Sequence, residues 1–106
     1  MATEGIAATI QQLAAAYEPY IIERRRHFHK HPELSLQEFQ TTEDIARELD
    51  AMGIPYERPL ETGLIATLRG TAPDAYDANG TPRRRILLRA DIDALPVTER
   101  TGEEFA

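Results

Sequence analysis

Two aspartates near a proline are the residues of this sequence best placed to do chemistry. Asp91 and Asp93 follow the apolar run of residues 86–88, and an apolar run without alternation is typical of a strand buried on both faces. In an extended chain, residues two apart point to the same face. Both carboxylates would then converge where Pro96 ends the strand, which is where open α/β sheets bind ligands.

Two like charges at a buried strand end are costly unless a cation or hydrogen-bond donors compensate them. The pair Asp91 and Asp93 therefore indicates the edge of a metal or substrate site. An exposed acidic turn after a strand explains the same spacing equally well, and the spacing alone does not separate the two hypotheses.

Three histidines form a second candidate cluster. His27 and His31 are four residues apart, a spacing that places both on one face of a helix, as in zinc motifs. However, no glutamate lies between them, and Pro32 disrupts the helix at its end. With His29 and the neighbouring basic residues, they are better explained as cations that complement the carboxyl end of a helix dipole.

Composition limits the possible functions of the chain. Its 106 residues carry a formal net charge of −6 and include no cysteine, which disfavours nucleic acid and anionic membranes as partners and excludes thiolate ligands and disulfides. No apolar run approaches the ~20 residues of a membrane span. Residues 1–5 lack the basic and apolar regions of a signal peptide, so we expect a cytoplasmic protein.

The element that carries the histidines is a predicted helix over about residues 4–31. Pro19 lies inside it and predicts a kink or two helices on one axis, because proline removes a backbone hydrogen bond and clashes with the preceding turn. Apolar residues recur at steps of three, four or seven, which predicts one apolar face; they are Ile6, Ile10, Leu13, Tyr17, Ile21 and Phe28.

A second helix is predicted over about residues 36–52. Ser35 and Glu38 have the spacing of a capping box, and Leu34 with Phe39 matches the accompanying hydrophobic staple. Replacing Ser35 with alanine is accordingly expected to cost about 1 kcal/mol. Gly53 is expected to end the helix in the left-handed conformation.

Three strands are predicted after the helices, over about residues 54–60, 64–69 and 84–92, with a long polar loop over residues 71–82 that we expect to be mobile. The fold class is therefore α/β, with two helices followed by three strands. Two helices cannot cover both faces of a sheet whose last strand is buried. The chain should therefore be part of something larger or pair with a second copy.

Two segments together resemble a known family. Residues 24–42 (R-R-R-H-F-H-K-H-P-E-L-S-L-Q-E-F-Q-T-T) and 87–99 (L-L-R-A-D-I-D-A-L-P-V-T-E) are similar, in this order, to two signatures of metal-dependent amidohydrolases that cleave N-acyl amino acids. The segment G-L-I-A-T-L-R-G over residues 63–70 also fits. Hippurate hydrolases, auxin-conjugate hydrolases and N-acetyl-diaminopimelate deacetylases form this group, within the metallopeptidase family of aminoacylases and glutamate carboxypeptidases.

The resemblance implies that residues 1–106 are the N-terminal portion of a zinc-peptidase-like α/β catalytic domain. In the wider family a metal-binding histidine and a supporting aspartate precede the proline. Aligned on Pro96, Asp93 takes the place of the supporting aspartate, which orients a ligand, and Asp91 stands, as a weaker candidate, where the histidine is missing. In the acyl-amino-acid branch a later cysteine replaces that histidine.

The family's cysteine and histidine segment, its glutamate pair and its later histidines do not occur in this chain. The resemblance therefore implies a longer enzyme that uses a divalent metal (zinc, manganese or cobalt) and an N-acyl amino acid substrate, with no metal expected in this chain and no activity of the chain alone. We expect the protein to form a homo-oligomer. The alternative is a non-catalytic module that self-associates or binds a partner.

Overall fold

The computed structural model describes residues 2–98 and 100–103, and the side chains of residues 2–4 are not described. Glu99, the last residue of the second signature, and residues 104–106, where the resemblance stops, lie outside the described residues. The chain divides into two units, Met1–Pro32 with Pro96–Ala106, and Glu33–Leu95. The elements in order are α1 (Ala2–Lys30), α2 (Phe39–Met52), β1 (Tyr56–Glu57) and β2 (Ile65–Ala66), a mixed α/β arrangement.

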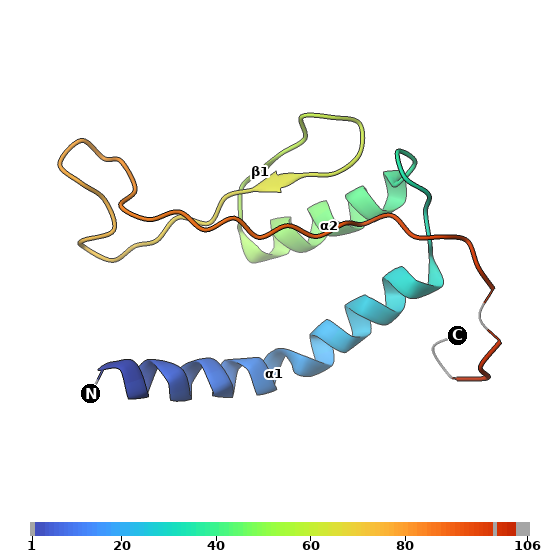
Figure 1. The fold of residues 1–106 in the computed structure, drawn as a ribbon, viewed down its shortest axis with the longest axis horizontal. Helices are drawn as coiled ribbons and strands as arrows, with labels where there is room; N and C mark the ends of the chain where they lie inside the picture. Colours follow the sequence, from blue (N-terminus) through green and yellow to red (C-terminus); the bar gives the residue numbers. More distant parts are fainter. Residues whose placement is uncertain (1, 99, 104–106) are drawn as a thin grey trace. The chain divides into compact units, whose positions relative to one another are not determined.

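Helix α1 runs for 29 residues with Pro19 inside it, and Figure 1 shows that its axis bends part-way along. The bend is the kink expected from proline, whose ring cannot fit against the carbonyl of the preceding turn. Five residues of the predicted apolar face are each more than half exposed; they are Ile6, Ile10, Leu13, Tyr17 and Ile21. No helix in the described part of the chain is long and apolar enough to cross a membrane.

Helix α2 begins three residues later than the sequence predicts. Leu36 adopts a left-handed backbone with φ 68°, and the Gln37 N–H donates to the Leu34 carbonyl at 2.9 Å, so these residues form a turn instead of a first helical turn. The N-cap residue is Glu38, with no side-chain cap hydrogen bond. The predicted capping box of Ser35 and Glu38 is therefore wrong, because the chain is not helical after Ser35.

The carboxylate of Glu33 takes over the task of capping α2. It accepts hydrogen bonds from the backbone N–H of Gln40 at 3.1 Å and of Thr41 at 2.5 Å, and from the Thr41 hydroxyl at 2.5 Å. The first N–H groups of a helix have no partner within it, so an acceptor here is stabilising. Partial burial raises the pKa of Glu33, but the hydrogen bonds from Thr41 and Gln40 outweigh it and the pKa is lowered overall.

The carboxyl end of α2 is built as predicted. Gly53 has φ 73° in the left-handed region, and its N–H donates to the Asp50 carbonyl at 3.1 Å, while the Ile54 N–H donates to the Leu49 carbonyl at 3.0 Å. These bonds satisfy carbonyls that the helix leaves without partners. The chain can then reverse into the strands.

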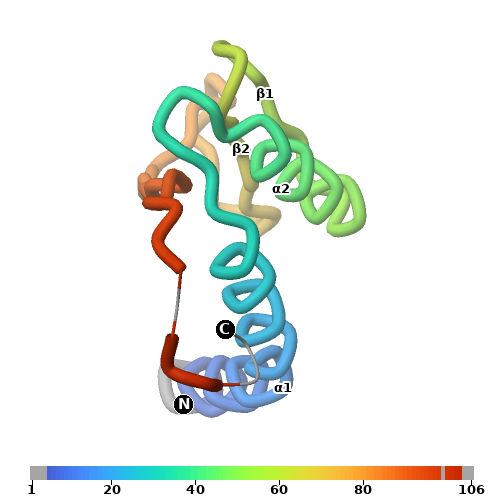
Figure 2. Tube along the Cα trace, turned by 90° about the vertical axis from the view of Figure 1, so that its right-hand side faces the viewer, coloured from blue at the N-terminus to red at the C-terminus, as the bar shows by residue number. Residues whose placement is uncertain are grey.

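Strands β1 and β2 pair antiparallel, with Tyr56 opposite Ala66 and Glu57 opposite Ile65. Thr42, 1% exposed, joins their connection to α2: its hydroxyl donates to the Glu38 carbonyl at 2.6 Å and accepts from the Gly63 N–H at 2.8 Å. The turn between the strands therefore lies beside the first turn of α2 (Figure 2). Both strands are much shorter than predicted.

The prediction of a third, buried strand over residues 84–92 is wrong for the structure of this chain. Figure 1 shows an extended trace there, but no strand is assigned to it, and Ile86, Leu87 and Leu88 are 88%, 89% and 90% exposed. A strand needs a neighbour for its backbone groups. The two-residue ladder of β1 and β2 is paired within itself and supplies none to this segment.

Residues 71–82 form the predicted loop, and it contains a closed turn. The Asp77 carboxylate accepts from the N–H groups of Asn79 at 2.8 Å and Thr81 at 3.0 Å, and Gly80 has φ 78°. Tyr76 and Pro82 form an isolated bridge at its base. Asp77 therefore shapes a turn at Asn79 and Gly80.

The capping role of Glu33 predicts that Glu33→Gln lowers the free energy of unfolding by about 1 kcal/mol at neutral pH, the usual cost of losing a helix cap. Ser35→Ala is the matched control and should change stability little. Urea unfolding followed by circular dichroism measures both. A larger loss for Ser35→Ala would restore the capping box and contradict the role given to Glu33.

The same contact fixes a pH dependence. Because the folded pKa of Glu33 lies below its ordinary value of 4.5, the stability it supplies is present above about pH 4.5 and is lost as the pH falls through the folded pKa. The difference between the wild type and Glu33→Gln should therefore shrink in acid.

The buried hydroxyl of Thr42 predicts that Thr42→Val destabilises the chain by about 1–3 kcal/mol, because valine fits the space but leaves the Gly63 N–H without its acceptor. Thr42→Ser keeps the hydroxyl and should lose less. Thermal unfolding of the two variants decides the matter, and equal losses would mean that the methyl group, and not the hydroxyl, is what the site needs.

Candidate functional site

The acidic segment is tied to the start of α2. The Ala94 N–H donates to the backbone carbonyl of Glu33 at 2.8 Å, while the side chain of Glu33 holds the first turn of α2. Asp93 is the residue next to this anchor. Glu33 thus fixes both the helix start and the position of the acidic pair along the chain.

The two aspartates are exposed at the surface of their unit. Asp91 forms an ion pair with Arg89 at 3.1 Å, with side chains 73% and 83% exposed, and such an exposed pair contributes little to stability. Water screens the repulsion of the two carboxylates, so the pair needs no compensating cation here. The expectation of a buried strand end is therefore not met, while the roles of Asp93 and Asp91 in a metal or substrate site remain predictions.

The N-terminal turn of α2 holds a buried acidic group as well. Glu38 is 9% exposed, and one of its carboxylate oxygens has no hydrogen-bond partner among the residues that the structure describes. Buried polar atoms usually find a partner. The spacing from Ser35 predicts a capping role for Glu38, but its side chain is buried instead.

The three histidines lie at the end of α1. His27 and His29 are in its last turn. His31 lies one residue past the helix, and its backbone N–H donates to the Phe28 carbonyl at 3.3 Å. The imidazole rings of His27 and His31 are 4.8 Å apart between centroids, tilted by 52°. The spacing noted in the sequence therefore brings two rings together.

Among the described residues, no group of three or more histidine, cysteine, aspartate or glutamate side chains is arranged to hold a metal ion. A catalytic zinc centre usually takes three protein ligands. The residues of this part of the chain therefore do not fit, by themselves, the metal centre that the family resemblance implies.

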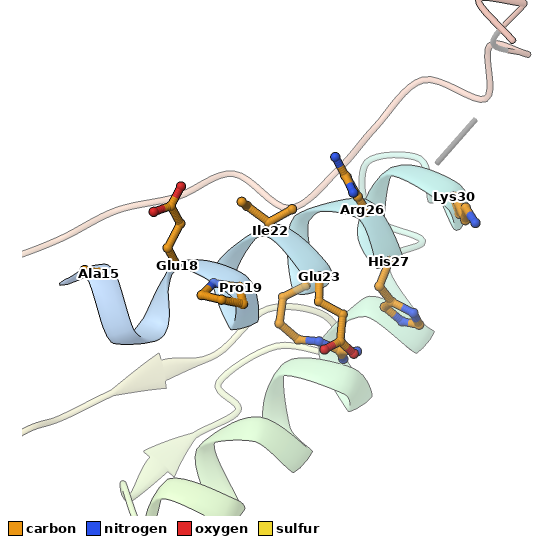
Figure 3. A pocket seen from close by; sticks show the side chains of 9 residues that line it. Ala15, Glu18, Pro19, Ile22, Glu23, Arg26, His27 and Lys30 are labelled. Atoms are coloured by element: carbon orange, nitrogen blue, oxygen red, sulfur yellow. The ribbon is translucent and has the colours of Figure 1, made fainter. Parts of the chain in front are cut away.

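Asp91 and Asp93 do not line either of two open hollows on the surface of the described residues. One, of about 780 Å³, lies along α1 around Pro19 (Figure 3). The other, of about 1020 Å³, lies between residues 65–70, 74–76 and 82–87. The first is formed by one helix and is open to solvent, so it does not have the enclosed shape of a small-molecule site.

An ion pair that no sequence pattern predicts ties the β1–β2 connection to α2. Both terminal guanidinium nitrogens of Arg58 donate to the Glu43 carboxylate, at 2.6 Å and 3.1 Å. The hydrogen bond from Arg58 lowers the pKa of Glu43, and the same bond raises the pKa of Arg58. Fifteen residues separate the partners, and no local pattern could have predicted the contact.

Comparison with known proteins gives several matches. Over 86 residues, or 81% of this chain, it is 48% identical to a protein named "Uncharacterized hydrolase" from Staphylococcus saprophyticus. Proteins of the same name from Staphylococcus haemolyticus and Staphylococcus aureus strain USA300 are 46% and 50% identical over the same length. The chain is related to proteins named as hydrolases.

This chain spans about a fifth of the length of those relatives, since the match covers 20% of each. No protein-family profile matches it, and no solved structure does. The relatives are named as hydrolases, and their names state neither a substrate nor a metal.

Proposed function

We propose that the chain is the N-terminal portion of the catalytic domain of a metal-dependent amidohydrolase, which cleaves the amide bond of N-acyl amino acids or small peptides. The observation that carries the proposal is the 44–50% identity over 86 residues to proteins named as hydrolases. The resemblance of residues 24–42 and 87–99 to amidohydrolase signatures supplies the finer assignment.

In this proposal the chain provides a scaffold and one supporting carboxylate. Glu33 joins the first signature to the second, because its side chain caps α2 and its carbonyl binds Ala94. Asp93, next to that anchor, would hold a ligand of the active site by a hydrogen bond, and such partners fix a ligand's orientation and raise its basicity. Asp91 has the lesser role.

The resemblance to the amidohydrolases implies a divalent metal, which is zinc, manganese or cobalt. Its ligands would come from the remaining four-fifths of a protein of the relatives' length. The chain by itself is then inactive. A cytoplasmic location, a homo-oligomer and the absence of nucleic-acid and membrane partners complete the proposal.

A second candidate function is self-association or partner binding. It is favoured by the exposure of Ile86, Leu87 and Leu88, which form an extended apolar run at the surface. Exposed apolar patches and open strand edges are typical of interaction sites. A second copy of the chain could pair with this run as a neighbouring strand.

The hydrolase proposal predicts that Asp93→Asn, in a longer protein carrying this segment, reduces turnover or metal content by about 10- to 100-fold, as losing a partner of a metal ligand does. Asp91→Asn is the matched control and should cost less. N-acetyl and N-benzoyl amino acids with added zinc, manganese or cobalt are the substrates to assay, with the 106-residue chain as the inactive baseline. Full activity and metal in Asp93→Asn would reject the assignment.

The self-association proposal predicts that the 106-residue chain dimerises or forms larger species at micromolar concentration. Leu87→Lys places a charge in the exposed apolar run and should shift it towards monomer, as charges on edge strands do. Sedimentation equilibrium across a tenfold dilution measures both proteins. A wild-type chain that stays monomeric throughout would remove the basis for this candidate.

A further inference from the structure

The end of α1 brings two imidazole rings into one place. His27 is half-buried in the last turn of the helix, and His31 follows the helix by one residue. The Phe28 carbonyl accepts the His31 N–H at 3.3 Å, which continues the helix by a tighter turn and keeps His31 one turn above His27. Residues four apart on a helix are neighbours on its surface.

The distance between the rings fits two ligands of one metal ion. With metal–nitrogen bonds of about 2.0–2.1 Å, each ring centroid lies about 3.2 Å from the metal. Ligands at about 90°, as in square-planar sites, then place the centroids about 4.5 Å apart, and tetrahedral ligands about 5.2 Å. The observed separation is 4.8 Å.

The surroundings decide what the pair can bind. The carboxyl end of a helix carries a partial negative charge that favours a cation, and Glu23 extends from the same side of α1 as His27 (Figure 3). Glu23 is already paired with Arg24 at 3.0 Å, and Lys30 adds positive charge to the last turn. The positive charges of Arg24 and Lys30 weaken the electrostatic attraction of a cation to this helix end. A strongly hydrated cation that does not prefer nitrogen ligands therefore has no reason to bind here.

We propose that His27 and His31 form a two-histidine clamp for a first-row divalent transition metal of the kind that imidazole prefers, namely Ni²⁺, Cu²⁺ or Zn²⁺. Water completes the coordination, since no third protein ligand is arranged around the pair among the described residues. The clamp uses only residues of this chain, and its argument does not rest on the proposed hydrolase activity. It fastens the turn that precedes Pro32 and Glu33 to the end of α1.

The ring contact alone also suits two imidazoles that stack without a metal, and the chain contains its own control for that case. His29 lies in the same turn, but two residues from His27, which places it towards the opposite side of the helix. A clamp needs His27 and His31 and not His29. A loose basic cluster would use all three histidines alike.

The test is a titration of the 106-residue chain, free of any affinity tag, with Ni²⁺ and with Zn²⁺ near neutral pH, and with Mg²⁺ as a hard cation that imidazole does not favour. Calorimetry gives the affinity, and the imidazole resonances in NMR show which rings respond. His27→Ala and His31→Ala should each weaken Ni²⁺ binding by about tenfold or more, because the second ligand binds at high effective concentration. His29→Ala should change it by less than about twofold.

The double variant His27→Ala with His31→Ala should be little weaker than either single variant, since one ligand alone gives no clamp. Circular dichroism without metal checks that each variant keeps its helix, and His31→Ala, outside α1, is the variant least able to disturb it. Absence of saturable Ni²⁺ binding would overturn the proposal. Equal losses on removing His29 would overturn it too, because they would show a cluster without defined geometry.

Discussion

One residue, Glu33, positions both the start of α2 and the segment that ends the unit Glu33–Leu95. The side chain of Glu33 reaches seven and eight residues along the chain to accept hydrogen bonds from Gln40 and Thr41, and its backbone carbonyl accepts from Ala94. The start of α2 and the segment that carries the acidic pair are therefore both positioned by the same residue. The N-cap residue Glu38 makes no side-chain cap hydrogen bond, so the Glu33 carboxylate is the side-chain acceptor for the N–H groups of Gln40 and Thr41.

The interior around this carboxylate is polar to an unusual degree. Among the described residues, Ala46 is the buried apolar one, whereas Glu38, Thr41, Thr42 and Asp44 are the buried polar ones. Hydrogen bonds contribute only about 0.5–1.5 kcal/mol each, although an unmatched buried partner costs more. The arrangement of α2, β1 and β2 thus depends on specific bonds such as Thr42 to Gly63, and less on apolar burial.

Local patterns were sufficient to predict the two helices, the bend at Pro19 and the end of α2 at Gly53, because each is set by residues within one or two turns. Local patterns failed at Ser35, where the sequence has the spacing of a capping box but the chain forms a turn with a left-handed Leu36 instead of a helix. Local patterns also failed at residues 86–88. An apolar run indicates that a segment tends to be buried, but it does not show whether the chain provides a partner strand. The acidic pair was located by its motif, while its anchor through Ala94 depends on a contact across sixty-one residues, between Glu33 and Ala94.

The distant cap of α2 has a consequence for how the chain folds. The segment has two competing start points. The capping-box pattern predicts a local one after Ser35, and the folded chain uses the one at Phe39, which follows the turn of residues 33–38. Closing a short loop takes about 10–100 ns, faster than most helices form, so the turn can be made before the helix is committed. A sequence in which a nearby preference disagrees with the final structure is locally frustrated, and here the disagreement lies in the first signature itself.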